Sequence, residues 1–422
     1  MKKLFIYILI TLFFNTNLFA ESLNQAILKA YNKNPKLNAE RENIKISKEN
    51  INISKSDYLP SVTLSGTKSK EDTGKLTNQS GGDASIADVE PLTTSLLIEQ
   101  TLYDGSRNAD LKKNKIGLDV AKIKLLKVEQ EILYQAVEAY TGLALANKKY
   151  TINQSNVNLL MRQVNKDKAR LESGQISSAD LAQSESSLAG AQAKFIEAKN
   201  EVITGKLIYE NVIGSIKSIE DINDKLNFVI KLPKSLDEAN EISKKNSPEL
   251  IIAKLELQQS EKDIKIAQAN LGPSATLSFE TSQTEDLSAT YDEREKNVLK
   301  ATVKWPFYTG GKNRATLNKN KNLNYQKELL LEDAITSNKT KVASAWSSYQ
   351  SSISLLDSVK SQVKAAEIAN EGITAEYQSG SRSTLDVIQS NTLLLDSKIS
   401  LANTERSYLL SQFKLLQSVG LL

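Results

Sequence analysis

The chain has 422 residues, carries 54 Lys and Arg against 50 Asp and Glu, and contains neither His nor Cys. Because the charges nearly balance, nothing favours a nucleic-acid-binding protein, which would show a basic stripe. The missing His and Cys remove the usual residues of zinc sites, thiolate nucleophiles, imidazole bases and haem ligation. We therefore expect no metal, no cofactor and no enzymatic activity. The 7 Pro and 17 Gly are few, which suits long uninterrupted elements.

Residues 1–20 have the organisation of a secretory signal peptide. Two lysines, Lys2 and Lys3, precede an apolar run of about eleven residues, and the segment ends at the small residue Ala20. That run is too short to span a bilayer as a helix, which takes about twenty residues. We expect cleavage near Ala20 and export of the mature chain. Since no later apolar stretch approaches that length, any membrane crossing would have to be made by strands.

The rest of the chain reads as an internal duplication. Four landmarks of the first half recur in the same order in the second half, which is the signature of a repeat. They are S-L-x-x-A-x8-P-x-L at 22–37 and 235–250, P-S-x-T-L-S at 60–65 and 273–278, Y-x-G at 103–105 and 308–310, and S-G-x5-D at 173–180 and 379–386. We predict a first repeat over residues 21–214, a linker over 215–234 and a second repeat over 235–422.

Each repeat begins with two helices and continues into two strands. A short amphipathic helix (22–33; 235–246) ends before a proline, and a helix of about 22 residues follows it. The strands are predicted at about 61–70 and 92–103 in the first repeat and at about 274–284 and 297–308 in the second. Apolar and polar residues alternate in them, which indicates one apolar and one polar face. The polar segments 67–91 and 281–296 read as exposed loops.

Two long helices close each repeat. Apolar residues recur every seven positions along them, for example Leu111, Leu118, Leu125 and Ile132 in the first repeat. This period predicts antiparallel coiled-coil packing. A helix from about 106 to 172 would be roughly 100 Å long, which is more than a compact core requires.

The strands have the length and alternation of strands that cross an outer membrane. Four strands cannot close a barrel, because roughly eight is the smallest practical number, and an open edge in lipid leaves backbone groups unpaired. Several chains would have to pool their strands, and a trimer would supply twelve around a polar pore. Five aromatic residues where strands meet helices fit either a girdle at the membrane interface or core packing at a domain corner. They are Tyr58, Tyr103, Trp305, Phe307 and Tyr308.

The repeated S-L-x-x-A…P motif, the turn from Tyr308 to Gly311 and the segment from Tyr377 to Val387 together resemble the TolC family of outer membrane efflux proteins. The resemblance covers essentially the whole mature chain. It implies a mainly α-helical homotrimer with a shared twelve-stranded β-barrel in the outer-membrane lipid. Below the barrel it implies a periplasmic α-helical tunnel, with residues 215–234 in an equatorial girdle. It further implies a periplasmic adaptor, an inner-membrane ABC or proton-driven pump, and export of proteins or small toxic molecules.

The ends of the two helical hairpins carry a candidate site. Gly174 and Gly380 can take the left-handed conformation that stops a helix. An S-x-x-D capping box follows each glycine, ending at Asp180 and at Asp386, and capping alone would explain these residues. The family resemblance implies a further role for part of this segment.

By resemblance, Tyr377, Arg382, Asp180 and Asp386 form or border a periplasmic entrance, which the tyrosine and arginine hold shut by links between helices. In a trimer, three copies of Asp386 would make the mouth cation-selective, and their mutual repulsion would raise the pKa of some of these carboxyls.

Two residues depart from the family pattern. Gln389 stands where some members have a second ring of aspartates, and Ala179 replaces a hydroxyl residue that can accept a link from the arginine. We expect from these two changes a weaker closed state and a milder block of the channel by cations.

Other classes of protein fit parts of the pattern. A non-conducting periplasmic coiled coil could use its strands as a cap, and a periplasmic adaptor also has a helical hairpin. Adaptors usually hold one hairpin beside lipoyl-like strands, whereas two hairpins are predicted here. An enzyme is least favoured, because Asp180 and Asp386 have no recognisable partner base. The cargo and the pump are not encoded in any motif of the chain.

Overall fold

The computed structural model describes residues 22–75, 77, 79–82, 88–216, 222, 231–288 and 291–422. The signal peptide predicted over 1–20 and most of the linker predicted over 215–234 lie outside these residues. The elements are α1 (Leu23–Lys33), α2 (Pro35–Ser56), β1 (Ser61–Lys68), β2 (Leu92–Asp104), α3 (Arg107–Glu172), α4 (Ser178–Val212), α5 (Leu236–Asn246), α6 (Pro248–Ala269), β3 (Ser274–Ser288), β4 (Tyr291–Lys304), α7 (Lys312–Gln378) and α8 (Thr384–Val419). None of these helices is long and apolar enough to cross a membrane.

The described residues fall into two compact units. The hairpin unit consists of the described residues up to Asn38 together with Glu129–Ser243 and Lys341–Leu422, and the sheet unit consists of Ala39–Val128 and Lys244–Thr340. The order of two short or medium helices, two strands and two long helices occurs twice, as the sequence predicted. The long helices run without interruption because no proline stands between residue 92 and Leu232, or after Pro306.

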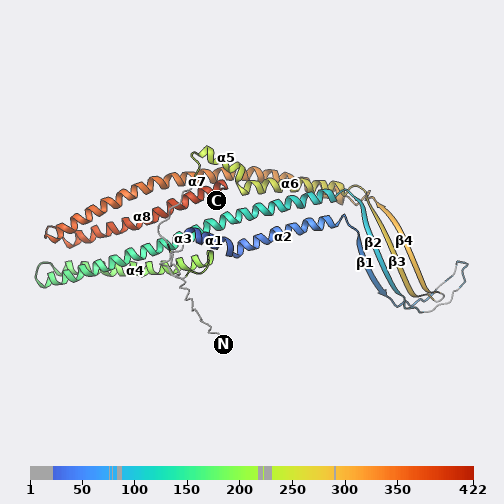
Figure 1. Ribbon diagram of the computed structural model, residues 1–422, viewed down its shortest axis with the longest axis horizontal. Helices are drawn as coiled ribbons and strands as arrows, with labels where there is room; N and C mark the ends of the chain where they lie inside the picture. The colour runs from blue at the N-terminus through green and yellow to red at the C-terminus, as the bar shows by residue number, and fades with distance from the viewer. Residues whose placement is uncertain are drawn as a thin grey trace, which may run out of the picture. The chain divides into compact units, whose positions relative to one another are not determined.

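In the hairpin unit, α4 folds back along α3 and α8 folds back along α7 (Figure 1). The predicted seven-residue period is buried in part, since Ile132 is 2% exposed whereas Leu111, Leu118 and Leu125 are half-buried. One cluster joins Leu160 of α3, Ala191 of α4 and Ile388 of α8, so it contains residues of both repeats. Burying a side chain such as leucine contributes about 1.5–3 kcal/mol, so this cluster adds apolar stabilisation between the hairpins.

The sheet unit contains one four-stranded sheet in the order β1-β2-β3-β4, with every neighbouring pair antiparallel (Figure 1). Its register aligns Val62 with Ile98, Ile98 with Phe279, and Phe279 with Leu299. One face of the sheet is therefore apolar. The opposite face carries mainly hydroxyl and charged side chains, since neighbours along a strand point to opposite faces.

The structure corrects the loop predicted over 281–296. β3 continues to Ser288 and β4 already begins at Tyr291, with pairs from Thr281↔Asn297 to Glu285↔Glu293. Both faces of the sheet are polar here, so the alternation that marks a strand is lost although the backbone ladder continues. At its other end β4 stops at Lys304, short of the predicted 308, because Pro306 has no N–H group to donate to a ladder.

Candidate functional site

The two hairpins turn in the same way at their tips. Gly174 has φ 71° and Gly380 has φ 85°, both in the left-handed region that side chains with a Cβ avoid. A Cβ added to either glycine would have no atom within 4 Å, so the backbone conformation and not crowding requires glycine there. α3 and α7 end at these turns, as the sequence predicted, and α4 and α8 begin just after them.

Both return helices start with a complete capping box. The backbone N–H of Asp180 donates to Ser177 Oγ at 3.2 Å, and the N–H of Ser177 donates to Asp180 Oδ2 at 3.0 Å. Ser383 and Asp386 repeat this geometry with the same two distances. Each pair satisfies N–H groups that a helix start otherwise leaves without partners.

The capping geometry lowers the pKa of both aspartates. For Asp180 the largest cause is the hydrogen bond from the Ser177 hydroxyl, and for Asp386 it is the hydrogen bond from the backbone N–H of Ser383. These bonds favour the charged carboxylate. In the single chain both residues therefore act as ionised helix caps. The mutual repulsion expected in a ring of Asp386 side chains would need two further copies of the chain.

Tyr377 lies in a buried polar network between the hairpins. Its hydroxyl donates to Asp167 Oδ1 at 2.8 Å and accepts from Gln163 Nε2 at 2.9 Å. Gln163 Nε2 also lies 3.1 Å from both Asp167 oxygens, and Ser184 Oγ donates to Asp167 Oδ2 at 2.6 Å. The network joins α3, α4 and α7, so Tyr377 links the second hairpin to the first.

Asp167 is the centre of this network, and its side chain is 0% exposed. A buried carboxylate is costly unless several donors satisfy it, and here three side chains do so. The Arg170 guanidinium lies 4.8 Å from the centre of the Tyr377 ring and adds a nearby positive charge. Removal of this carboxylate would take an acceptor from three buried donors, and of these Ser184 has no other acceptor among the described hydrogen bonds.

The sequence analysis did not identify Asp167, although a signal for it was present. Leu160, Val164 and Asp167 follow the spacing of one helix face, and Leu160 and Val164 are 5% and 4% exposed. A charged residue on an apolar face indicates a specific buried partner. The partner, Tyr377, stands 210 positions away in the sequence.

The structure places Arg382 differently from Tyr377. Arg382 Nε donates to Glu376 Oε2 at 2.7 Å, and both side chains are about half exposed. This hydrogen bond raises the pKa of the Arg382 guanidinium. The pair lies within the second hairpin, whereas Tyr377 reaches Asp167 of the first. Asp180 and Asp386 contact neither Tyr377 nor each other among the described hydrogen bonds.

The aromatic residues singled out from the sequence lie near the end of the sheet where the helices begin, and none is packed into a core of the chain. Their exposed fractions are 43% for Tyr58, 55% for Tyr103, 64% for Trp305, 89% for Phe307 and 85% for Tyr308. Trp305 Nε1 donates to the carbonyl of Leu271 at 3.1 Å, and its ring meets the Phe307 ring edge to face. Core packing within one chain therefore does not account for these residues.

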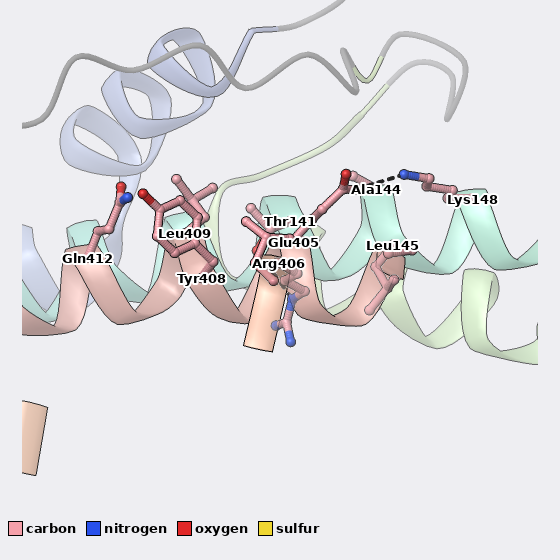
Figure 2. A pocket seen from close by; sticks show the side chains of 11 residues that line it. Thr141, Ala144, Leu145, Lys148, Glu405, Arg406, Tyr408, Leu409 and Gln412 are labelled. Atoms are coloured by element: carbon pink, nitrogen blue, oxygen red, sulfur yellow. Dashed lines mark hydrogen bonds and ion pairs between the residues drawn. The ribbon is translucent and has the colours of Figure 1, made fainter. Parts of the chain in front are cut away.

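A groove of about 400 Å³ between α3 and α8 lies in the middle of the hairpin unit. Figure 2 shows Lys148 of α3 and Glu405 of α8 joined at this groove, with Nζ and Oε2 2.9 Å apart. Arg406 of α8 donates to Thr141 Oγ1 at 3.3 Å and to the carbonyl of Glu138 at 3.2 Å. These contacts join the two repeats, so we interpret the groove as a joint between hairpins.

No constellation suited to catalysis emerges from these contacts. Asp180 and Asp386 cap helices, and the oxygens of the buried Asp167 accept hydrogen bonds from side chains of the same unit. Within the part of the chain that the structure describes, no group of three or more acidic side chains could hold a metal ion.

Residues 26–206 and 241–421 each match the outer membrane efflux protein family. Outer membrane efflux protein BepC of Brucella suis is 27% identical over 408 residues, which cover 95% of this chain and 86% of BepC. Outer membrane protein TolC of Salmonella enteritidis is 24% identical over 421 residues, which cover 97% of this chain and 84% of TolC. The crystal structure of the CmeC outer membrane channel of Campylobacter jejuni shares the fold, with a TM-score of 0.82 at 14% identity over 94% of this chain and 85% of CmeC. The chain therefore belongs to the outer membrane efflux protein family, whose members are outer-membrane channels for efflux or secretion that extend into the periplasm.

Proposed function

We propose that three copies of this chain pool their sheets into one closed barrel of twelve strands, through which cargo crosses the outer membrane. The antiparallel four-stranded sheet carries this proposal. Because its strands alternate in direction, the outer edge of β4 on one copy can pair antiparallel with the outer edge of β1 on the next. An even number of strands then closes into a ring, and closure satisfies backbone groups that lipid cannot hydrogen-bond.

The apolar face of the sheet supports contact with lipid. Val62 and Leu64 on β1 are 62% and 73% exposed, and Leu299 and Val303 on β4 are 71% and 73% exposed. An exposed apolar surface of this regularity marks an interaction site. The exposed aromatic residues at its end near the helices, Trp305 among them, are suited to the level of the lipid headgroups.

Exposed apolar residues on the helices support a tunnel wall built from neighbouring copies. Ile196 and Ile203 of α4 are seven positions apart and are 60% and 53% exposed, and Leu207 is 62% exposed. These apolar side chains follow a coiled-coil spacing and are exposed in the single chain, and a helix of an adjacent copy would bury them.

In this assembly the chain is a conduit without chemistry of its own. We propose that a periplasmic adaptor and an inner-membrane pump, either an ABC or a proton-driven pump, deliver the cargo to it, and that residues 215–234 contribute to an equatorial girdle. The pump would decide whether the cargo is a protein or a small toxic molecule.

We further propose that the hairpin tips form the entrance and that the network around Asp167 helps to hold it closed. Tyr377 of the second hairpin bonds directly to Asp167 and Gln163 of the first, so loss of its hydroxyl would remove this polar link between the hairpins. Arg382 and Glu376 lie within one hairpin and would contribute less to closure. The Asp386 side chains of three copies would line the mouth and favour cations.

Single-channel conductance of the purified protein in planar bilayers tests this function. We expect discrete openings from a trimer, cation selectivity that falls in Asp386→Asn, and a larger conductance in Tyr377→Phe. Asn keeps an acceptor for the cap at Ser383, and Tyr325→Phe, at a tyrosine of α7 that is 61% exposed, is the matched control. A folded monomer that never inserts would contradict the channel. Unchanged conductance in Tyr377→Phe would contradict the latch alone.

A further inference from the structure

The polar face of the sheet carries a column of positive charge on one strand. Arg294, Lys296, Lys300 and Lys304 of β4 are all separated by even numbers of residues, so they lie on the same face of the strand. All four are exposed. They share this face with Val298, Thr302 and one acidic residue, Asp292, so β4 contributes four cations and one carboxylate to it.

The neighbouring strand leaves these cations without direct charge partners. The register of β3 with β4 sets Ser274 opposite Lys304, Ser278 opposite Lys300, Ser282 opposite Lys296 and Thr284 opposite Arg294. Every direct cross-strand partner is therefore a hydroxyl residue. No ion pair is formed by these four cations among the described side chains.

Besides Asp292 near the start of β4, the carboxylates on this face stand on the inner strands. Glu280 of β3 lies opposite Val298, and Glu99 of β2 lies opposite Ser278. Asp104, opposite Ser274 beyond the bulge in β2, already accepts hydrogen bonds from the backbone N–H and the hydroxyl of Ser106. Positive charge thus predominates along β4, the edge strand, whereas most of the carboxylates of this face lie on β2 and β3.

β1 forms the opposite edge of the sheet and is neutral on the same face. Ser61, Thr63, Ser65 and Thr67 alternate with Val62, Leu64 and Gly66, and they align with the polar-face residues of β2. In the proposed ring each β4 would adjoin a β1 of the next copy. The basic column would then lie between β1, which is neutral on this face, and β3, which contributes hydroxyls and one carboxylate, Glu280, so most of the positive charge would remain.

We propose that β4 gives the sheet end of the conduit an anion-attracting lining that favours acidic polypeptide segments of the cargo. This inference rests on the proposed trimeric barrel, because only ring closure turns the polar face into the wall of a pore. The apolar face must contact lipid, so the polar face with its cations lines the lumen. Three columns within a narrow lumen concentrate anions, since low-dielectric walls focus the field.

Two parts of the chain would therefore carry opposite charges. The acidic capping residues lie at the hairpin tips, whereas the cations lie on the sheet. An acidic segment of cargo that has passed the tips would be attracted towards the exit, and the many weak contacts along β4 would not bind it tightly. This arrangement assigns a charge preference to the sheet that is independent of the one at Asp386.

Block of the channel current by a polyanion tests the proposal. Poly-L-glutamate is added to each side of a bilayer containing the full-length protein, with poly-L-lysine of equal length as the probe of opposite charge. From the sheet side we expect block by poly-L-glutamate to weaken roughly tenfold or more in Lys296→Gln/Lys300→Gln/Lys304→Gln. Block should also disappear in 1 M KCl, where the Debye length falls to about 3 Å.

The chain offers two matched controls. Lys68→Gln removes a lysine of β1 that follows the apolar-face spacing and pairs with Glu90, so block should stay unchanged. Arginine at the three β4 positions should retain block, because charge and not residue identity is required. If the triple variant fails to assemble, Lys300→Gln alone tests the proposal, and we expect it to weaken block by poly-L-glutamate to a smaller extent.

The results separate this inference from the proposed function. Equal block of the wild-type protein and the triple variant, at equal conductance, would overturn the anion-attracting lining while leaving the channel intact. A folded wild-type protein that forms no channel would overturn the trimeric barrel and the lining together.

Discussion

The two hairpin tips share their turns and caps and differ in their interiors. Both have a glycine in the left-handed conformation followed by a serine–aspartate capping box with matching distances. At the position of Asp167 in the first hairpin, the second hairpin has Ile373, and at the position of Tyr377 in the second, the first has Leu171. Both halves keep the glycine turn and the capping box. The polar network, in contrast, needs Asp167 from the first half and Tyr377 from the second.

This difference shows which features a repeat can keep unchanged. A cap needs only residues within three positions, so each copy forms it independently of the other. The network around Asp167 needs Gln163 and Ser184 from one hairpin and Tyr377 from the other. Divergence after duplication therefore turned two similar hairpins into an asymmetric pair held together by a buried carboxylate.

The largest effect is expected from Asp167→Ala. Three buried donors would lose their acceptor, and the free energy of unfolding should fall by about 3 kcal/mol or more. The change in denaturant midpoint at constant slope measures it. Glu172→Ala removes an exposed acid near the end of the same helix and should stay within about 0.5 kcal/mol. A loss below about 1 kcal/mol in Asp167→Ala would contradict the role of this network.

The link between the hairpins can be measured by a double-mutant cycle. Asp167→Asn and Tyr377→Phe should couple by about 1–2 kcal/mol, because each removes one partner of the same 2.8 Å hydrogen bond. The free energies of unfolding of the two single variants and the double variant supply the coupling. Additive effects of the two substitutions would show that the hairpins are held together by apolar packing alone.

The two turns should respond equally to one substitution. Gly174→Ala and Gly380→Ala should each cost roughly 1 kcal/mol or slightly more, since only the left-handed backbone opposes the methyl group. Thermal unfolding of the two variants compares them directly. Gly190→Ala lies within α4 at a site with free space and should not destabilise the protein. A clear difference between the two turn variants would show that the tips are not equivalent.

The smallest effect concerns the pH dependence of the caps. Asp180 and Asp386 have lowered pKa values in the folded chain, so their capping is fully present above the ordinary aspartate pKa of about 3.9. The stabilisation is lost as the pH falls through the lowered values, because protonation removes the charge-assisted acceptor. The protection of amide hydrogens in the first turns of α4 and α8, measured against their intrinsic exchange rates, should fall for both helices together below about pH 4. Asp180→Asn should remove this dependence from α4 only.

Much of this fold follows from local patterns in the sequence. The duplication, the short helices before proline, the long helices and the capping boxes were all predicted, because each depends on residues close together in the chain. The strands β1 and β2 were also placed from alternation, and their register with β3 continues the apolar face through Val62, Ile98 and Phe279. The site residues that cap helices belong to this group.

Other features depended on contacts between distant segments. The extension of β3 and β4 through residues 281–296 has two polar faces, so only the pairing of backbones reveals it. The apolar pattern predicted the long helices but gave no partner for Asp167. Tyr377 was identified from its motif, yet its partner is Asp167 and not a residue of either capping box.

The sequence by itself determined the repeated plan, the helices with their caps and the alternating faces of the strands, since these depend on periodicity and on neighbours within one turn. The tertiary structure decided which side chains meet across 210 positions and which residues of β4 face hydroxyls of β3. Hydrogen bonds and charge partners between such segments depend on register and packing, and no local spacing specifies either.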